Sequence, residues 1–141
     1  MPNSWNIPAG LNNVGSYQVS GAPYATASIQ ALAADGTPVA FPQVTRWVQI
    51  TNHDVSVLRV GFSSNGVRQG AYDGYGGYNY FSVPASGSSG PGVSPVLELK
   101  VSELWLVGSG NADVLAGLTS IPAARTSGSL GINWSGSSGV G

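Results

Sequence analysis

The residue best suited to acid–base chemistry is the single histidine of the chain, His53, which is followed directly by Asp54. A histidine and a carboxylate are two members of a serine-hydrolase triad, and serines are plentiful in this sequence. A triad needs its three groups to converge around an oriented base, and the sequence marks no such partner for His53. The triplet Asn52, His53 and Asp54 is instead typical of a turn, in which short polar side chains bind the local backbone. We therefore predict that His53 has no catalytic role.

Other reactive patterns are weaker still. Glu98 and Glu103 lie five positions apart on a predicted strand, so without a bulge they face opposite sides of the sheet and cannot work as paired acids. The stretch GSSGPG at 87–92 is as rich in glycine as a phosphate loop, but it lacks the Lys-Ser/Thr pair and precedes a strand instead of a helix. The chain has no cysteine, which excludes disulfides, thiolate zinc sites and cysteine nucleophiles. We predict a protein that is not an enzyme and that holds no cofactor and no metal.

The tyrosines are the residues in this sequence that point to a binding surface. Tyr72 and Tyr75 lie within a glycine-rich stretch, residues 64–77, which we predict to be a long loop. A tyrosine on a polar loop offers a flat apolar ring and a hydroxyl, a combination found on adaptable binding surfaces. Both residues are candidates for an exposed recognition loop. Tyr78 and Tyr80 begin a predicted strand and are expected to cap one end of the fold.

The chain is poor in charge. Only 8% of its residues are Asp, Glu, Lys or Arg, against about 25% in an average globular domain. Because the cores of protein–protein interfaces are depleted in charge, we infer that much of the surface is buried against neighbours. A soluble secreted domain with a neutral polar surface is the alternative.

The same composition argues against two classes of partner. Five scattered basic residues and a net charge of −1 cannot form the basic cluster that a phosphate backbone needs, so no nucleic acid is expected. No stretch approaches the run of about 20 apolar residues needed to span a membrane. The opening MPNSWNIPAG lacks the basic and apolar regions of a secretory signal. We predict neither nucleic-acid binding nor membrane insertion.

Two-residue alternation of apolar and polar side chains recurs along the chain, interrupted by 21 glycines and 9 prolines. The sequence predicts strands at 24–32, 44–51, 57–63, 78–83, 96–107 and 112–121, with weaker extended segments at 15–20 and 39–41. Short strands of uneven spacing, joined by turns and two long loops, predict an all-β fold, either an antiparallel β-sandwich or a jelly roll.

Several local features make this prediction specific. In the first clear strand, Ala25, Ala27, Ile29 and Ala31 share one face, and the Ala-Asp-Gly at 34–36 predicts a turn. The strands at 44–51 and 57–63 are separated by a short polar turn, which predicts an antiparallel hairpin. Arg46 falls on the apolar face of its strand, so it needs a strand end or a partner. The core is predicted to contain Leu58, Val60, Phe62, Leu97, Leu99, Val101 and Leu118.

The alternation within 96–107 shifts by one residue at Ser102 and Glu103. Such a shift predicts a bulge, or a strand that changes partners at a corner of the fold.

Several segments together resemble a known family. They are VSGAPYATASI, FPQVTRWVQITN, LRVGFSSNGV, YFSVPASGS, LELKVSELWLVG, AGLTSIPAAR and GSLGI, in this order over roughly residues 19–135. The chain resembles the small single jelly-roll penton proteins of large icosahedral DNA viruses, especially viruses of algae. The resemblance lies in order and spacing, since none of these segments is chemically diagnostic.

The resemblance implies a structural protein of the virion, made in the host cytoplasm, that forms a homopentamer at the capsid vertex. Its partners would be identical subunits, the surrounding major capsid protein and minor capsid proteins. A carbohydrate-binding, lectin-like β-sandwich is the alternative, with its function in the loop of Tyr72 and Tyr75.

The sequence divides into an N-terminal arm at 1–14, a jelly-roll domain at 15–125 and a Gly/Ser-rich tail at 126–141. Both ends are polar yet keep large apolar side chains, which gain nothing in water and which anchor interfaces elsewhere. We therefore predict that one or both ends become ordered only when they pack on neighbouring subunits. The residues assigned to the interface are Trp5, Ile7, Arg46, Trp47 and Trp134.

Overall fold

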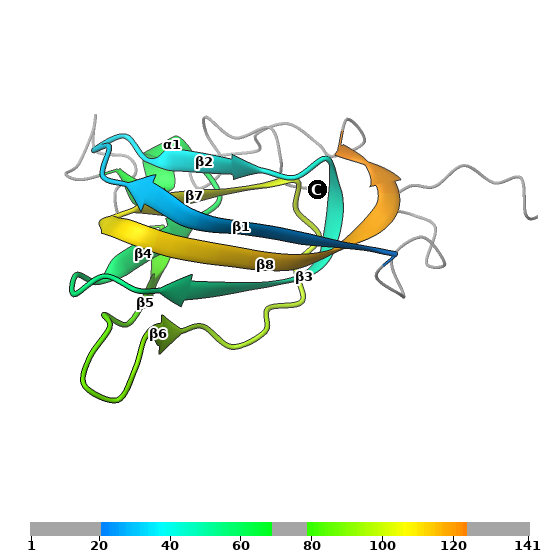
Figure 1. Ribbon diagram of the computed structural model, residues 1–141. Coiled ribbons are helices and arrows are strands. Elements are labelled where there is room, and N and C mark those ends of the chain that lie inside the picture. Colours follow the sequence, from blue (N-terminus) through cyan, green and yellow to red (C-terminus); the bar gives the residue numbers. More distant parts are fainter. Residues whose placement is uncertain (1–20, 69–78, 124–141) are drawn as a thin grey trace, which may run out of the picture.

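The computed structural model describes residues 21–68 and 79–123 of the chain, and the elements within these ranges are almost all strands (Figure 1). They are β1 (Ala22–Ala31), β2 (Thr37–Ala40), β3 (Gln43–Asn52), β4 (Leu58–Gly61), α1 (Ser64–Val67), β5 (Tyr80–Val83), β6 (Gly92–Val93), β7 (Glu103–Val107) and β8 (Ser109–Pro122). The predicted all-β antiparallel sandwich is confirmed. The start of the predicted loop at 64–77 is a single helical turn, α1, with Ser63 as its N-cap. The predicted extended segment at 15–20 lies outside the described residues.

Two four-stranded antiparallel sheets pack face to face, one in the order β1-β8-β3-β6 and the other in the order β2-β7-β4-β5. The pairing follows a simple rule: β1 pairs with β8, β2 with β7, β3 with β6, and β4 with β5. This is the order of a long antiparallel hairpin, with β4 and β5 at its tip, rolled up so that its strand pairs alternate between two sheets. In Figure 1 the first sheet lies in front and the second behind it.

Strand β1 contains a bulge that the sequence pattern did not predict. Thr26 lies opposite Val114 and Ile29 opposite Ala112, so three steps along β1 match only two along β8. The extra residue is accommodated at Ser28, whose φ of 57° is in the left-handed region. A two-against-one mismatch of this kind reverses which side chains of the strand point inward.

The predicted face of this strand is therefore wrong in its first half. Ala25 and Ala27 are exposed, whereas Tyr24 turns toward the core, where its ring meets Phe41 edge-on at a centroid distance of 5.0 Å. After the bulge, Ile29 packs against the core and Ala31 is buried, as predicted.

The predicted hairpin between the strands at 44–51 and 57–63 is also wrong. These strands are β3 and β4, and they belong to different sheets. The turn between them crosses from one sheet to the other, because the buried Asn52 side chain donates to Ser56 O at 2.7 Å and to Pro84 O at 3.0 Å. Ile50 and Leu58 consequently face each other's sheet across the core, and both are fully buried.

The shift in apolar–polar alternation at Ser102 marks a change of sheet. Of the two predicted explanations, a bulge or a strand that changes partners at a corner, the structure shows the second. Before the shift, Leu97 bridges Val48 and Val101 O accepts the N–H of Thr45, so this segment runs beside β3. After it, β7 pairs with β2 and β4 in the opposite sheet. The chain thus turns a corner at Ser102, and the apolar side changes with it.

The core lies between the two sheets. Four of the predicted core residues are buried and three are partly buried against the same cluster: Leu58, Val60, Val101 and Leu118 in the first group, Phe62, Leu97 and Leu99 in the second. The predicted turn at 34–36 is present, with Gly36 at a φ of 95° and its N–H donating to Ala33 O.

Candidate functional site

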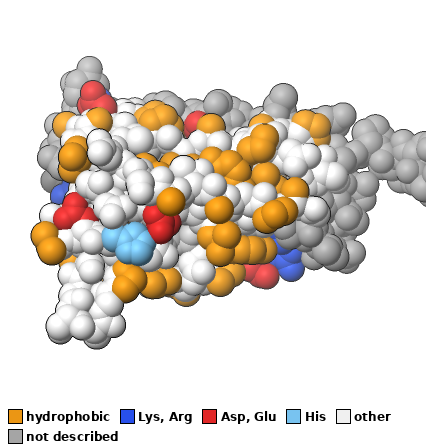
Figure 2. Space-filling view, in the orientation of Figure 1, with side chains coloured by type: hydrophobic (Ala, Val, Ile, Leu, Met, Phe, Trp, Pro, Cys, Tyr) orange, Lys and Arg blue, Asp and Glu red, His pale blue; other side chains and the backbone are white. Residues whose placement is uncertain are grey.

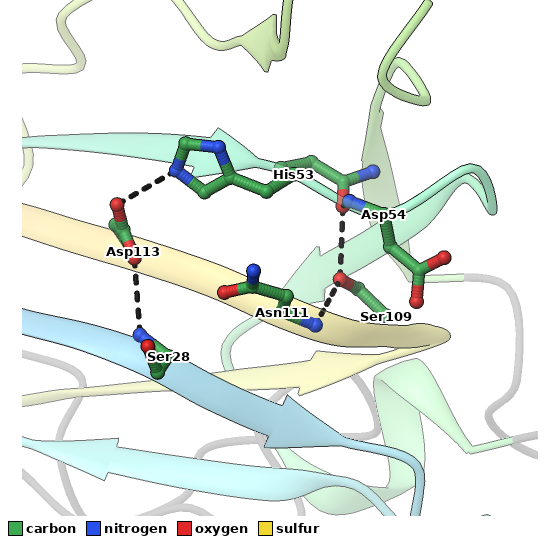
Figure 3. A network of polar contacts seen from close by, with 7 residues as sticks. Ser28, His53, Asp54, Ser109, Asn111 and Asp113 are labelled. Carbon is green, nitrogen blue, oxygen red and sulfur yellow. Dashed lines mark hydrogen bonds and ion pairs between the residues drawn. The ribbon is translucent and has the colours of Figure 1, made fainter.

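A polar cluster forms where the end of β3 meets the start of β8 (Figure 3). Asn52 lies at its centre, and its side chain is fully buried with all four bonding positions occupied. Its oxygen accepts from Asp54 N at 3.1 Å and from Ser109 Oγ at 2.9 Å, while its amide nitrogen makes the two bonds to carbonyls described above. A buried amide with complete hydrogen bonding joins the segments around it. Asn52 therefore joins three parts of the chain at this end of the sandwich: its own turn, Pro84 and Ser109.

Asp54 adds a second tie in the same region. One of its carboxylate oxygens accepts the Gly110 N–H at 2.6 Å, and the other accepts the Ser56 N–H at 3.3 Å. The hydrogen bond from Gly110 is the largest of the effects that hold the pKa of Asp54 below its ordinary value of 3.8. Asp54 thus remains ionised under ordinary conditions and serves as an acceptor for backbone groups.

His53 meets Asp113, a residue 60 positions away, with 2.8 Å between Nε2 of the ring and Oδ2 of the carboxylate. The other oxygen of Asp113 accepts the backbone N–H of Ser28 at 3.1 Å. The two side chains are 37% and 38% exposed, so an ion pair between them contributes at most about 1 kcal/mol to stability. Asp113 thereby connects β3, β8 and the bulge of β1.

This geometry differs from that of a serine hydrolase. There, the imidazole binds a serine hydroxyl on one side and a carboxylate on the other. Here, the backbone N–H of Ser28 donates to the carboxylate of Asp113, and Nε2 of His53 is hydrogen-bonded to the same carboxylate. The arrangement ties strands together. The carboxylate that meets His53 is thus that of Asp113 and not that of its neighbour Asp54. In the sequence, the signal for Asp113 is a lone Asp among the apolar residues of the strand at 112–121.

Two of the predicted interface residues, Arg46 and Trp47, lie within the described residues. Arg46 sits at a bulge of β3, since Thr45 is opposite Leu118 and Trp47 is opposite Gly117. It has the partner that its position required, Glu98, at 3.2 Å. Trp47 lies on the outer face of the sheet, on the opposite side of β3 from the buried Val48. Trp5, Ile7, Trp134, Tyr72 and Tyr75 lie outside the described residues.

The outer face of the sheet β1-β8-β3-β6 is poor in charge, and we call it the front face. By strand alternation its central residues are Pro23 and Ala25 of β1, Leu115 and Gly117 of β8, Trp47, Gln49 and Thr51 of β3, and Val93 of β6. Leu115 and Val93 are 43% and 48% exposed. Figure 2 shows hydrophobic side chains distributed over this face, with few charged side chains among them. The front face has the composition of an interface core.

The outer face of the other sheet is covered within the subunit. Val67 of α1 is fully buried there, so close to β4 that a Cβ on Gly61 would lie 2.5 Å from it. A Cβ on Gly36 would lie 2.9 Å from Val67 and 3.1 Å from the Trp105 ring, which places these side chains in one cluster. The two faces of the sandwich therefore differ: in the described part of the chain, α1 packs on one of them and no element packs on the front face.

Comparison with known proteins gave no match: no family model, curated protein or solved structure is significantly similar to the chain. In residues 21–68 and 79–123, no three His, Cys, Asp or Glu side chains are grouped so that they could hold a metal ion. No helix in these ranges has the length and apolar character needed to cross a membrane.

Proposed function

We propose that this protein is a structural capsid protein, a single jelly roll whose copies form a homopentamer at the five-fold vertices of an icosahedral virion. The observation that carries the proposal is the strand pairing, in which the first strand pairs with the eighth, the second with the seventh, the third with the sixth and the fourth with the fifth. Eight strands rolled in this way into two facing sheets are characteristic of jelly rolls, which recur in viral capsids and lectins.

The front face favours the capsid function over the lectin function. A monomeric domain usually keeps its surface soluble with mixed charges, whereas this face exposes Leu115 and Val93 beside small residues. Its one charged residue near the centre, Asp113, is already bound to His53 and to a backbone N–H. A face without free charge suits burial against an identical copy, because it needs no complementary charge on the partner.

In this proposal the contacts between subunits are of the head-to-tail kind, which form a closed ring when successive rotations return to the starting point. The ring would lie in the capsid shell after synthesis in the host cytoplasm, with major and minor capsid proteins around it. The chain performs no catalytic step and needs no cofactor for this role.

The experiment is electron microscopy of the purified full chain in negative stain, with class averages computed without imposed symmetry. The proposal predicts rings with five-fold symmetry. Dimers, six-fold rings or isolated subunits at micromolar concentration would contradict it, and glycan binding by isolated subunits would favour the lectin function.

A pair of variants tests the surface separately. Leu115→Lys places a charge in the middle of the front face, and an unpaired buried charge costs several kcal/mol, so the ring should dissociate at a roughly hundredfold higher concentration. Ser88→Lys adds the same charge to an exposed loop and should leave the ring intact. Equal behaviour of the two variants would show that the front face is not the contact surface.

A further inference from the structure

Among the described residues, β1 is the longest strand at an edge of either sheet. The described sheets end at β1, β6, β2 and β5, and these strands have 10, 2, 4 and 4 residues. The β1 sequence APYATASIQA contains no charged residue. A long, uncharged edge strand is a template on which the strand of another molecule can pair, and proteins protect such edges with charges, prolines or bulges.

Pro23 protects only the start of β1, so the bulge is the protective feature in the middle of the strand. Ala27 and Ser28 together oppose the single residue Asp113, because Thr26 and Ile29 are three apart while their partners on β8 are two apart. A residue other than glycine in the left-handed region is disfavoured sterically, so the φ of 57° at Ser28 needs support from its surroundings. A compensating shift follows between Ile29 and Ala31, after which the original register returns.

Asp113 provides that support from directly opposite the bulge. Its Oδ1 accepts the N–H of Ser28 at 3.1 Å, which satisfies a backbone group that the bulge removes from the regular ladder. Its Oδ2 is held by Nε2 of His53 at 2.8 Å, which fixes the carboxylate in place (Figure 3). Both oxygens are therefore engaged, one with the bulge and one with the end of β3.

We propose that Asp113 is a register lock: it holds the bulge in β1 and so prevents β1 of one molecule from pairing edge to edge with β1 of a second copy. His53 is a positioning residue in this lock. The proposal goes beyond the capsid function, since it concerns a competing association that a flat β1 would permit. Without the lock, β1 straightens and offers its outer backbone groups to another chain in continuous register.

The test is amide hydrogen exchange of the full chain, followed by mass spectrometry of peptides from residues 22–31 at two protein concentrations. Asp113→Ala removes the acceptor, and Asp113→Asn is the matched control because its amide oxygen can still accept the Ser28 N–H. In the alanine variant, exchange in β1 should slow with rising concentration, by roughly tenfold between the two concentrations, because amides that pair with a second chain are protected from solvent. The wild type and Asp113→Asn should show no dependence on concentration.

Two further variants separate the lock from general stability. Ser28→Val leaves Asp113 in place but disfavours positive φ, so it should behave like Asp113→Ala. Ser28→Gly adopts this φ freely and, added to Asp113→Ala, should restore the wild-type behaviour. Unfolding would speed exchange in every peptide, which is the opposite sign. The proposal is wrong if exchange in β1 is independent of concentration in both Asp113→Ala and Ser28→Val, or if Ser28→Gly fails to restore it.

Discussion

Replacing Asn52 with alanine tests the centre of the polar cluster where the end of β3 meets the start of β8. The side chain is fully buried and makes four hydrogen bonds, to Asp54 N, Ser109 Oγ, Ser56 O and Pro84 O. Each neutral bond contributes about 1 kcal/mol net, and the groups left behind at a buried site lose their partners as well. We expect a loss of about 4 kcal/mol in the free energy of unfolding, which corresponds to a fall of roughly 10 °C in Tm for a domain of this size.

The assay is urea unfolding at one fixed protein concentration, because assembly of identical subunits would add to the apparent stability. Asn111→Ala is the matched control, since the Asn111 side chain is exposed, and it should change stability by no more than about 0.5 kcal/mol. A loss below about 1 kcal/mol for Asn52→Ala would refute the reasoning that this amide joins the three segments.

Three further outcomes follow from the structure and the sequence. The hydrogen bond from Gly110 lowers the pKa of Asp54, so the ionised carboxylate stabilises the fold above the unfolded pKa of 3.8, and this stabilisation is lost as the pH falls below that value. Asp54→Asn should therefore make the unfolding midpoint less dependent on pH in this acidic range. An unchanged pH dependence there would contradict the assignment. Gly92→Ala should destabilise the fold in thermal melts, since its Cβ would clash with the backbone carbonyl of Pro84, whereas Gly87→Ala, with open space around it, should not; equal melting temperatures of the two variants would contradict this. Deleting residues 1–14 should leave a folded domain but weaken the oligomer in sedimentation, and undiminished assembly would show that these residues are not an interface arm.

The sequence predicted the class of fold because that information is local. Alternation of apolar and polar residues, broken by glycine and proline, is visible within each strand. The change of sheet at Ser102 was visible for the same reason, as a shift in the alternation of a single segment. Arg46 was recognised as a residue that needs a partner because a charge on an apolar face is costly.

The errors arose where the outcome depends on residues distant in sequence. The alternation of Ala25, Ala27 and Ile29 is unbroken in the sequence, and only the pairing with β8 shows that a bulge reverses it. A short polar turn normally predicts a hairpin, but here the buried side chain of Asn52 directs the chain to the other sheet. The partner of His53 is 60 residues away, so the lone Asp in the strand at 112–121 could be noticed locally but not connected with His53.

The central claim, that five copies form a closed ring, is tested most directly by native mass spectrometry of the full chain. Five copies of the 14.3 kDa chain give a predicted mass of about 72 kDa. A single species of this mass that persists on dilution through the micromolar range is the result the account predicts. A 14.3 kDa monomer across that range, or a ladder of dimers and tetramers, would contradict it.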